Sequence, residues 1–252
     1  ASAWYKAANA LKARYTMRLL NKSSNKTKDL EDILTYVNNS FKSAAEECKL
    51  TIYDGDSQVN PLWGFSYSRN SFAASESLID KFVERNDPRA PQAFIEPDPT
   101  GYIVYGYGGD QATDIESINF APNGTPDEVQ NIYGMSMALW AITTPTQLIS
   151  YHEIKFLEAE ALCRLGRKSE AEAALKEAVI AGFANTENML IDATENWVGG
   201  EVNLGADVAE DYFEKSVKPL FTVNPLKETM IQKYLSFFGA SGESTEAYCD
   251  YR

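Results

Sequence analysis

A single histidine limits the catalytic chemistry that this sequence can support. His152 is the only histidine among 252 residues, so a serine or cysteine nucleophile activated by histidine would depend on it alone. His152 and Glu153 open a pattern similar to that of zinc proteases, but the place of the second histidine is taken by Phe156. That zinc site therefore cannot form. The sequence predicts no metal centre and no cofactor, and it favours a protein that is not an enzyme.

Carboxylates are plentiful, with 36 aspartates and glutamates, so counting alone leaves a glycosidase pair open. Glu158 and Glu160 stand two residues apart in a helical pattern and therefore point to different faces of the helix. Asp54 and Asp56 resemble the start of a calcium loop, but the glutamate expected downstream is missing. We interpret these side chains as structural or solvated charges, and an α-helical glycosidase stays the third alternative.

Aromatic residues interleaved with polar ones suggest sugar binding. A ring can stack on the C–H face of a pyranose, while neighbouring amides and carboxylates bind its hydroxyls. In the segment 101–111, Tyr105 and Tyr107 would share one face of a strand. Aromatic side chains also commonly anchor long loops to a scaffold, which is the alternative interpretation. The residues predicted to bind a glycan are Tyr102, Tyr105, Tyr107, Tyr133, Trp140 and Trp63, and Tyr67 forms a second candidate cluster with Trp63.

Helical hairpins are the elements expected to position these side chains. Residues 144–183 predict two helices joined by a tight turn, with Thr144 as the first cap, Gly166 in the turn and Ser169 as the second cap. Alanines on both helices allow close packing, and residues 151–184 have the length of one tetratricopeptide unit. Hairpins of this kind are scaffolds that bind rather than catalyse.

The N-terminal segment predicts another helical hairpin. Its helices are expected at 2–22 and roughly 28–48, joined by the polar stretch 21–28. The apolar residues of the first helix recur at helical spacing, so we expect that face, including Trp4 and Tyr15, to lie in the core. The residues of this face are Trp4, Ala8, Leu11, Tyr15 and Leu19.

The segment from about 50 to 143 is less regular. It holds most of the prolines and many aromatic residues, with short helices expected at 75–85 and 125–133 and a short β-hairpin or structured loop at 101–111. Long connections on a rigid scaffold are where binding residues usually lie.

The C-terminal third predicts a loop after Phe183 and then helices near 207–217 and 226–238. Over the whole chain, the expected fold is mainly α. It is a single domain over residues 1–252, built from tetratricopeptide-like hairpins in an α-α superhelix with long aromatic-rich loops.

Composition excludes several partners. The formal net charge is −13, so the phosphates of nucleic acids and anionic lipids would repel the chain. No apolar run is long enough to span a bilayer. The three cysteines lie far apart, which favours free thiols over disulfides or a zinc site. The chain starts without methionine inside a predicted helix, which suggests a processed form or an excised piece.

Four segments of the chain carry recognisable motifs, in order: residues 4–20, 78–94, 150–166 and 230–252. The first carries Asn9, Leu11, Arg14 and Arg18, the second is an Asn-Asp-Pro-Arg turn, and the third is a helix with Glu153, Phe156, Ala159, Glu160 and Ala161. The fourth is an aromatic run followed by an acidic segment that ends in arginine. Together, in this order, the four segments resemble the SusD/RagB family of outer-membrane lipoproteins.

The resemblance implies a function as well as a fold. It implies a non-enzymatic protein on the outer face of the outer membrane that captures an oligosaccharide or polysaccharide and passes it to a SusC-like TonB-dependent transporter. The lipid anchor that would hold it there lies outside this chain, which resembles the middle and C-terminal part of a member. The alternative is a tetratricopeptide-like adaptor that binds a peptide or a protein partner.

Overall fold

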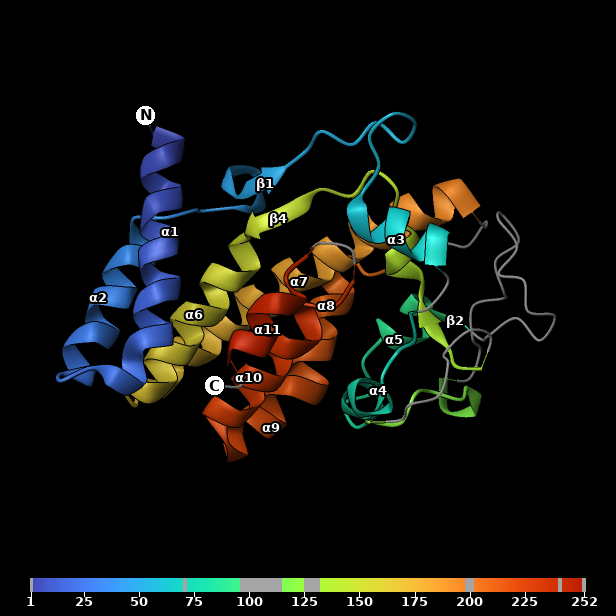
Figure 1. Cartoon of the computed structure of the whole chain (residues 1–252). Coiled ribbons are helices and arrows are strands. Elements are labelled where there is room, and N and C mark those ends of the chain that lie inside the picture. Colours follow the sequence, from blue (N-terminus) through green and yellow to red (C-terminus); the bar gives the residue numbers. More distant parts are fainter. Residues whose placement is uncertain are drawn as a thin grey trace.

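A computed structural model shows a mainly helical chain, with two short β-ribbons among the residues that it describes (Figure 1), and this confirms the predicted fold class. The predicted hairpin at 101–111 and most of the predicted helix at 125–133 lie outside the described residues. The structure describes residues 2–69, 72–95, 115–124, 132–197, 202–239 and 242–250.

The N-terminal hairpin is confirmed. Helix α1 (Ser2–Leu19) packs against α2 (Lys26–Asn38), and the side chain of Asn25 caps α2 by accepting a hydrogen bond from the backbone N–H of Lys28. The second helix ends at Asn38, so the predicted extent to residue 48 was wrong. The side chains of Asn39 and Ser40 donate to the carbonyls of Thr35 and Val37, and such local bonds compete with helix continuation.

The buried face of α1 differs from the prediction. Its small residues Ala7, Ala10 and Ala13 lie in the core, because they allow α1 to approach its neighbours closely. Trp4 is 80% exposed and Tyr15 is 52% exposed, so placing these two side chains in the core was wrong. The helix carries two apolar faces, and periodicity alone did not show which one is buried.

The central hairpin consists of α6 (Tyr151–Arg164) and α7 (Lys168–Trp197). Gly166 in the turn has φ +77°, a conformation that favours glycine, and the backbone N–H of Arg167 bonds to the carbonyl of Leu162 at 2.9 Å. The turn and the tetratricopeptide-like packing are therefore confirmed. Phe156 is fully buried, as expected.

The boundaries of this hairpin differ from those predicted. The cap of α6 is Ser150, whose Oγ accepts from the backbone N–H of Glu153 at 3.1 Å, whereas Thr144 precedes a strand. Helix α7 begins at Lys168, so Ser169 lies inside it. It also continues through the predicted loop after Phe183, because its last turns bury Met189, Leu190 and Ala193 at helical spacing.

Two antiparallel ribbons connect distant parts of the chain. Strand β1 (Cys48–Leu50) pairs with β4 (Thr146–Ile149), and β2 (Phe94–Ile95) pairs with β3 (Met135–Ser136). In Figure 1 the β1–β4 ribbon lies between α1 and α3. The middle segment adds α3 (Pro61–Arg69), α4 (Glu76–Val83), α5 (Ala90–Ala93) and short 3₁₀ turns at Ala44–Glu46, Ile115–Ser117 and Met137–Trp140.

The C-terminal helices complete the main core. As predicted for 207–217 and 226–238, they comprise α8 (Ala206–Tyr212), a π-helical turn (Phe213–Val217), α9 (Lys218–Val223) and α10 (Pro225–Ser236), followed by α11 (Ser244–Asp250). Helix α10 packs on α6 and α7. One buried cluster joins these helices to α4, α5 and the ribbon β2–β3, and a second lies among α1, α2 and α6.

The Asn-Asp-Pro-Arg turn anchors the middle segment in the core. Asn86 has φ +48°, and the fully buried guanidinium of Arg89 donates to the carboxylate of Asp87 at 3.0 and 2.6 Å. The rings of Phe82 and Phe183 lie 5.3 and 4.4 Å from that guanidinium. This turn is therefore a structural element of the core.

Buried ion pairs also join elements that are distant in sequence. Arg85 binds both carboxylate oxygens of Glu228 on α10, at 3.0 and 2.9 Å. Arg14 on α1 similarly binds both carboxylate oxygens of Glu153 on α6. Its Nε donates at 2.7 Å to one oxygen, and its Nη2 donates to the other. The arginines of the first two family-like segments thus fix those segments to the C-terminal half.

Candidate ligand-binding site

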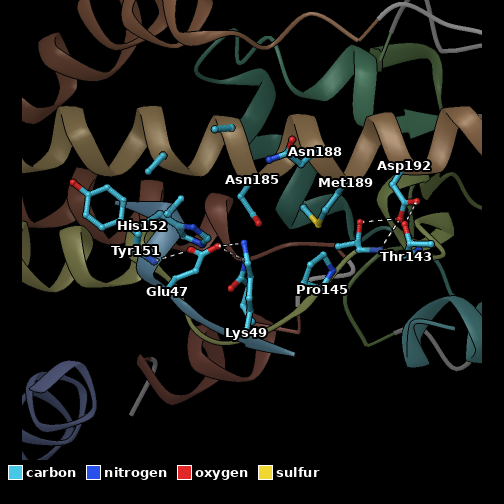
Figure 2. Close-up of a pocket in the computed structure, with 15 residues that line it drawn as sticks. Glu47, Lys49, Thr143, Pro145, Tyr151, His152, Asn185, Asn188, Met189 and Asp192 are labelled. Carbon is cyan, nitrogen blue, oxygen red and sulfur yellow. Dashed lines mark hydrogen bonds and ion pairs between the residues drawn. The ribbon is translucent and has the colours of Figure 1, made fainter. Parts of the chain in front are cut away.

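A cavity of about 350 Å³ lies between α7 and the β1–β4 ribbon, beside the N-terminus of α6 (Figure 2). Four parts of the chain line it: the start of β1, the segment that enters β4, the first turn of α6 and one face of α7. The residues that α7 contributes include Asn185, Asn188, Met189 and Asp192. These four recur at helical spacing and thus share one face of α7.

Asp192 holds one wall of the cavity in place. Its carboxylate accepts hydrogen bonds from the backbone N–H groups of Thr143 and Thr144 at 2.8 and 2.7 Å. It also accepts from their hydroxyls at 2.6 and 3.0 Å. Because these four bonds occupy its oxygens, Asp192 positions the segment before β4 rather than serving as a free acidic group.

Glu47 has the same role on the opposite wall. Its carboxylate accepts from Nε2 of Gln147 at 3.0 Å, from the backbone N–H of Tyr151 at 3.1 Å and from Nζ of Lys49 at 3.1 Å. These bonds join β1, β4 and the start of α6. The carboxylate therefore holds the cavity wall together.

His152 forms a buried ion pair at the edge of the cavity. Its Nε2 lies 2.7 Å from the carboxylate of Glu243, and both side chains are almost fully buried. Burial alone would lower the pKa of His152, but the charge and hydrogen bond of Glu243, with the charges of Glu47 and Glu153, raise it above 6.5. Because Glu243 occupies Nε2, the histidine is not an available base.

Two buried polar atoms of the cavity wall have no hydrogen-bond partner in the described part of the chain. They are Nδ2 of Asn185 on α7 and Oε1 of Gln147 on β4. Figure 2 shows Asn185 projecting from α7 toward the ribbon. Buried polar groups are nearly always paired, so an unpaired donor on α7 and an unpaired acceptor on the ribbon opposite make this cavity a candidate site for a ligand.

The structure brings two of the aromatic residues considered from the sequence together. Trp63 and Tyr67, one turn apart on α3, stack with ring centroids 4.8 Å apart. Tyr67 is 43% exposed, and Trp63 is half-buried against the core. Phe65 on the same helix is 48% exposed. Helix α3 therefore presents an aromatic surface.

The other predicted residues lie apart from this pair or outside the description. Trp140 is only 6% exposed and belongs to the core beside α3, and Tyr133 is half-buried. Tyr102, Tyr105 and Tyr107 lie outside the described residues. That these residues contact a ligand stays a prediction.

The carboxylates considered for catalysis have structural partners. Glu160 is buried and accepts from Nε of Arg164 at 2.9 Å, while Glu158 pairs with Lys155. Hydrogen bonds from Ser57 and from nearby backbone N–H groups lower the pKa of Asp54 to about 2, as in an ordinary turn. Within the described ranges, no cluster of histidine, cysteine or acidic residues could hold a metal ion, and no helix is long and apolar enough to cross a membrane.

The cavity residues were missed by reasoning from sequence. Asn185 and Asp192 fell in the segment predicted as a loop, where they carried no pattern. The signal that could have found them is their spacing with Met189, which places all three on one helical face. Gln147 fell in the range 144–183, which was predicted as helical, whereas it lies on strand β4.

Comparison with known proteins identifies the family. A family model described as "Starch-binding associating with outer membrane", SusD-like, matches residues 1–252. The chain belongs to the SusD/RagB family. A SusD/RagB family protein from Bacteroides thetaiotaomicron is 48% identical, with a TM-score of 0.89, over 99% of this chain and 52% of that one. No curated protein matches.

More distant SusD-like structures share the fold. A Bacteroides vulgatus outer-membrane protein described as probably involved in nutrient binding is 18% identical, with a TM-score of 0.73, over 99% of this chain and 55% of its own. A structure named as a chitin-binding protein is 19% identical, with a TM-score of 0.67, over 99% of this chain and 51% of its own. The chain thus spans about half the length of these SusD-like relatives.

The family assignment confirms the resemblance seen in the four sequence segments. SusD-like proteins associate with the outer membrane and form a family of nutrient-binding and glycan-binding proteins without catalytic activity. The third alternative, an α-helical glycosidase, has no support in this assignment. Tests of function therefore concern binding.

Proposed function

We propose that this SusD-like chain captures a glycan at the outer cell surface and delivers it to a SusC-like TonB-dependent transporter. Two observations support the proposal: membership of a family described as starch-binding and outer-membrane-associated, and the aromatic surface of α3. The glycan itself is left open, because aromatic side chains stack on pyranoses of many kinds.

The stacked pair Trp63–Tyr67 is the observation that carries the proposal. A pyranose buries its C–H face against such rings, while its hydroxyls stay available to polar groups at the rim. The exposed ring of Tyr67 offers the contact, and Trp63 behind it holds that ring in place. Trp140 packs beside α3 in the core, so we assign it a supporting role. Tyr133 and the cluster Tyr102, Tyr105 and Tyr107 are the remaining proposed contacts.

Affinity electrophoresis against a panel of polysaccharides tests glycan capture. We expect at least one polysaccharide to retard the chain, and we expect Tyr67→Ala and Tyr105→Ala to abolish the retardation. Tyr248→Ala is the matched control, because Tyr248 on α11 is also an exposed tyrosine, at 60%. No retardation by any polysaccharide, or undiminished retardation of Tyr67→Ala, would reject the α3 surface as a glycan site.

Delivery requires contact with a transporter. We expect a SusC-like transporter from the same locus to co-purify with the full-length protein from detergent-solubilised outer membranes. Failure to co-purify under conditions that preserve glycan binding would separate capture from delivery. Glycan capture would then stand without the second step.

The adaptor alternative has one observation in its favour. The exposed apolar stripe of α1, which includes Trp4, Tyr15 and Leu19, could receive an amphipathic helix. Peptide binding that is lost in Trp4→Lys and retained in Tyr67→Ala would favour the adaptor. Retardation by a polysaccharide that is lost in Tyr67→Ala and retained in Trp4→Lys would favour glycan capture.

A further inference from the structure

We propose that the cavity between α7 and the β1–β4 ribbon is a second binding site, which takes one neutral polyhydroxyl unit such as a monosaccharide. The site is separate from the aromatic surface of α3, and its test is independent of glycan capture there. Figure 2 shows its frame: α7 along one side and the strand residues opposite.

Unpaired amide atoms give the site its hydrogen-bonding character. Nδ2 of Asn185 is a donor and Oε1 of Gln147 is an acceptor, both buried and both without a partner among the described residues. A ligand that satisfies both must donate and accept. Hydroxyl groups do both, and adjacent hydroxyls of a sugar present the two functions side by side.

The charged groups of the wall argue against an ionic ligand. The carboxylates of Glu47 and Asp192 are occupied by protein donors and would repel an anion. The ammonium group of Lys49 would disfavour a cation. Positive and negative charges thus surround neutral amides, which suits an uncharged polar molecule.

Size and shape select a small ligand. A volume of about 350 Å³ lies near the lower end of the range for ligand pockets. Pro145 adds apolar surface on which the C–H face of a ring can rest. The cavity therefore fits one sugar ring rather than an extended chain.

The frame is already organised for binding. The four bonds of Asp192 fix the segment that enters β4, and Glu47 joins β1 to the start of α6. A ligand would consequently meet preset hydrogen-bonding groups and lose little free energy to ordering them.

Saturation-transfer NMR with D-glucose, D-galactose, D-mannose and N-acetyl-D-glucosamine tests the site. We expect one of these sugars to bind the native chain and Asn185→Ala to weaken its affinity about tenfold, as for the loss of one good hydrogen bond. Tyr67→Ala should bind that sugar normally, because it alters only the α3 surface. No binding of any of the four sugars to the native chain would overturn the proposal.

A second variant guards against an effect through folding. Ala181→Leu adds volume on the cavity wall and leaves both amides in place, so it should block binding while the thermal midpoint stays near the native value. Asn185→Ala should also melt near the native midpoint. Normal binding by both folded variants would show that the sugar lies elsewhere and would overturn the assignment to this cavity.

Discussion

The buried charges of the core and the buried amides of the cavity differ in how they are paired. In the core, Arg89 binds Asp87 and also donates to Ser236, and Arg85 binds both oxygens of Glu228. In the cavity, the charged groups are equally well paired, yet the amides of Asn185 and Gln147 each leave one atom open. Open amide atoms also occur away from the cavity, as at Oε1 of Gln232 on α10. What distinguishes the cavity amides is the open volume beside them, which makes them candidates for binding a ligand.

Among the variants that test this comparison, we expect Arg89→Ala to lower the free energy of unfolding most. Arg89→Ala would leave Asp87 as a buried unpaired carboxylate, so we expect a loss of about 3–5 kcal/mol in the free energy of unfolding, measured in urea. Arg167→Ala is the control, because Arg167 pairs with Glu170 at the surface, where solvent screens the pair, so its loss should be much smaller than that of Arg89→Ala. Equal losses for the two variants would contradict a structural role for complete pairing.

Packing density provides the second contrast. A Cβ at Gly182 on α7 would lie 2.6 Å from Oγ of Ser236 on α10, whereas a Cβ at Gly64 on α3 meets only a methyl of Val59 at 3.7 Å. We expect Gly182→Ala to lower the free energy of unfolding by about 1–3 kcal/mol through overpacking. Gly64→Ala should leave it unchanged or raise it. A native-like denaturation midpoint for Gly182→Ala would show that α7 and α10 are free to separate.

The His152–Glu243 pair should make stability depend on pH. Because the folded-state pKa of His152 is raised above 6.5, the pair contributes fully below pH 6.5, and the contribution is lost as pH rises through the folded-state pKa. Thermal midpoints measured across this interval should therefore fall with rising pH. In His152→Gln this fall should be absent, and a fall of unchanged size would assign it to other groups.

The smallest expected effect is at the open amide. Asn185→Ala removes a buried donor that has no partner in the described structure, so its free energy of unfolding should stay within about 0.5 kcal/mol of the native value. Chemical denaturation checks this. A loss as large as that of Arg89→Ala would show that Asn185 belongs to the frame of the cavity rather than to its ligand-binding surface.

The elements of the fold were largely predictable from sequence, but their faces and ends were not. Helix α1 has one apolar face made of alanines and another that carries Trp4 and Tyr15, and only the packing of α1 decides between them. The cap of α6 was predicted at Thr144 but lies at Ser150. Pairing of β1 with β4 decided it, by holding residues 146–149 in a strand.

The cavity could not be predicted, because its groups converge only through tertiary structure. Glu47 and Gln147 are 100 residues apart in the chain, and no local pattern links them. Their distance closes only when β1 pairs with β4 and α7 packs across the ribbon. The aromatic pair on α3 was more accessible, since Trp63 and Tyr67 are one helical turn apart.

The long-range arginine pairs have a consequence for how the chain is made. The partner of Arg14 lies 139 residues later in the chain, and the partner of Arg85 lies 143 residues later. At the pace of a ribosome, roughly 7 to 30 seconds separate the emergence of each arginine from that of its glutamate. During that interval neither ion pair can form. The bond of Arg14 therefore has to wait for α6 and that of Arg85 for α10, so these pairs are late contacts in the life of the chain.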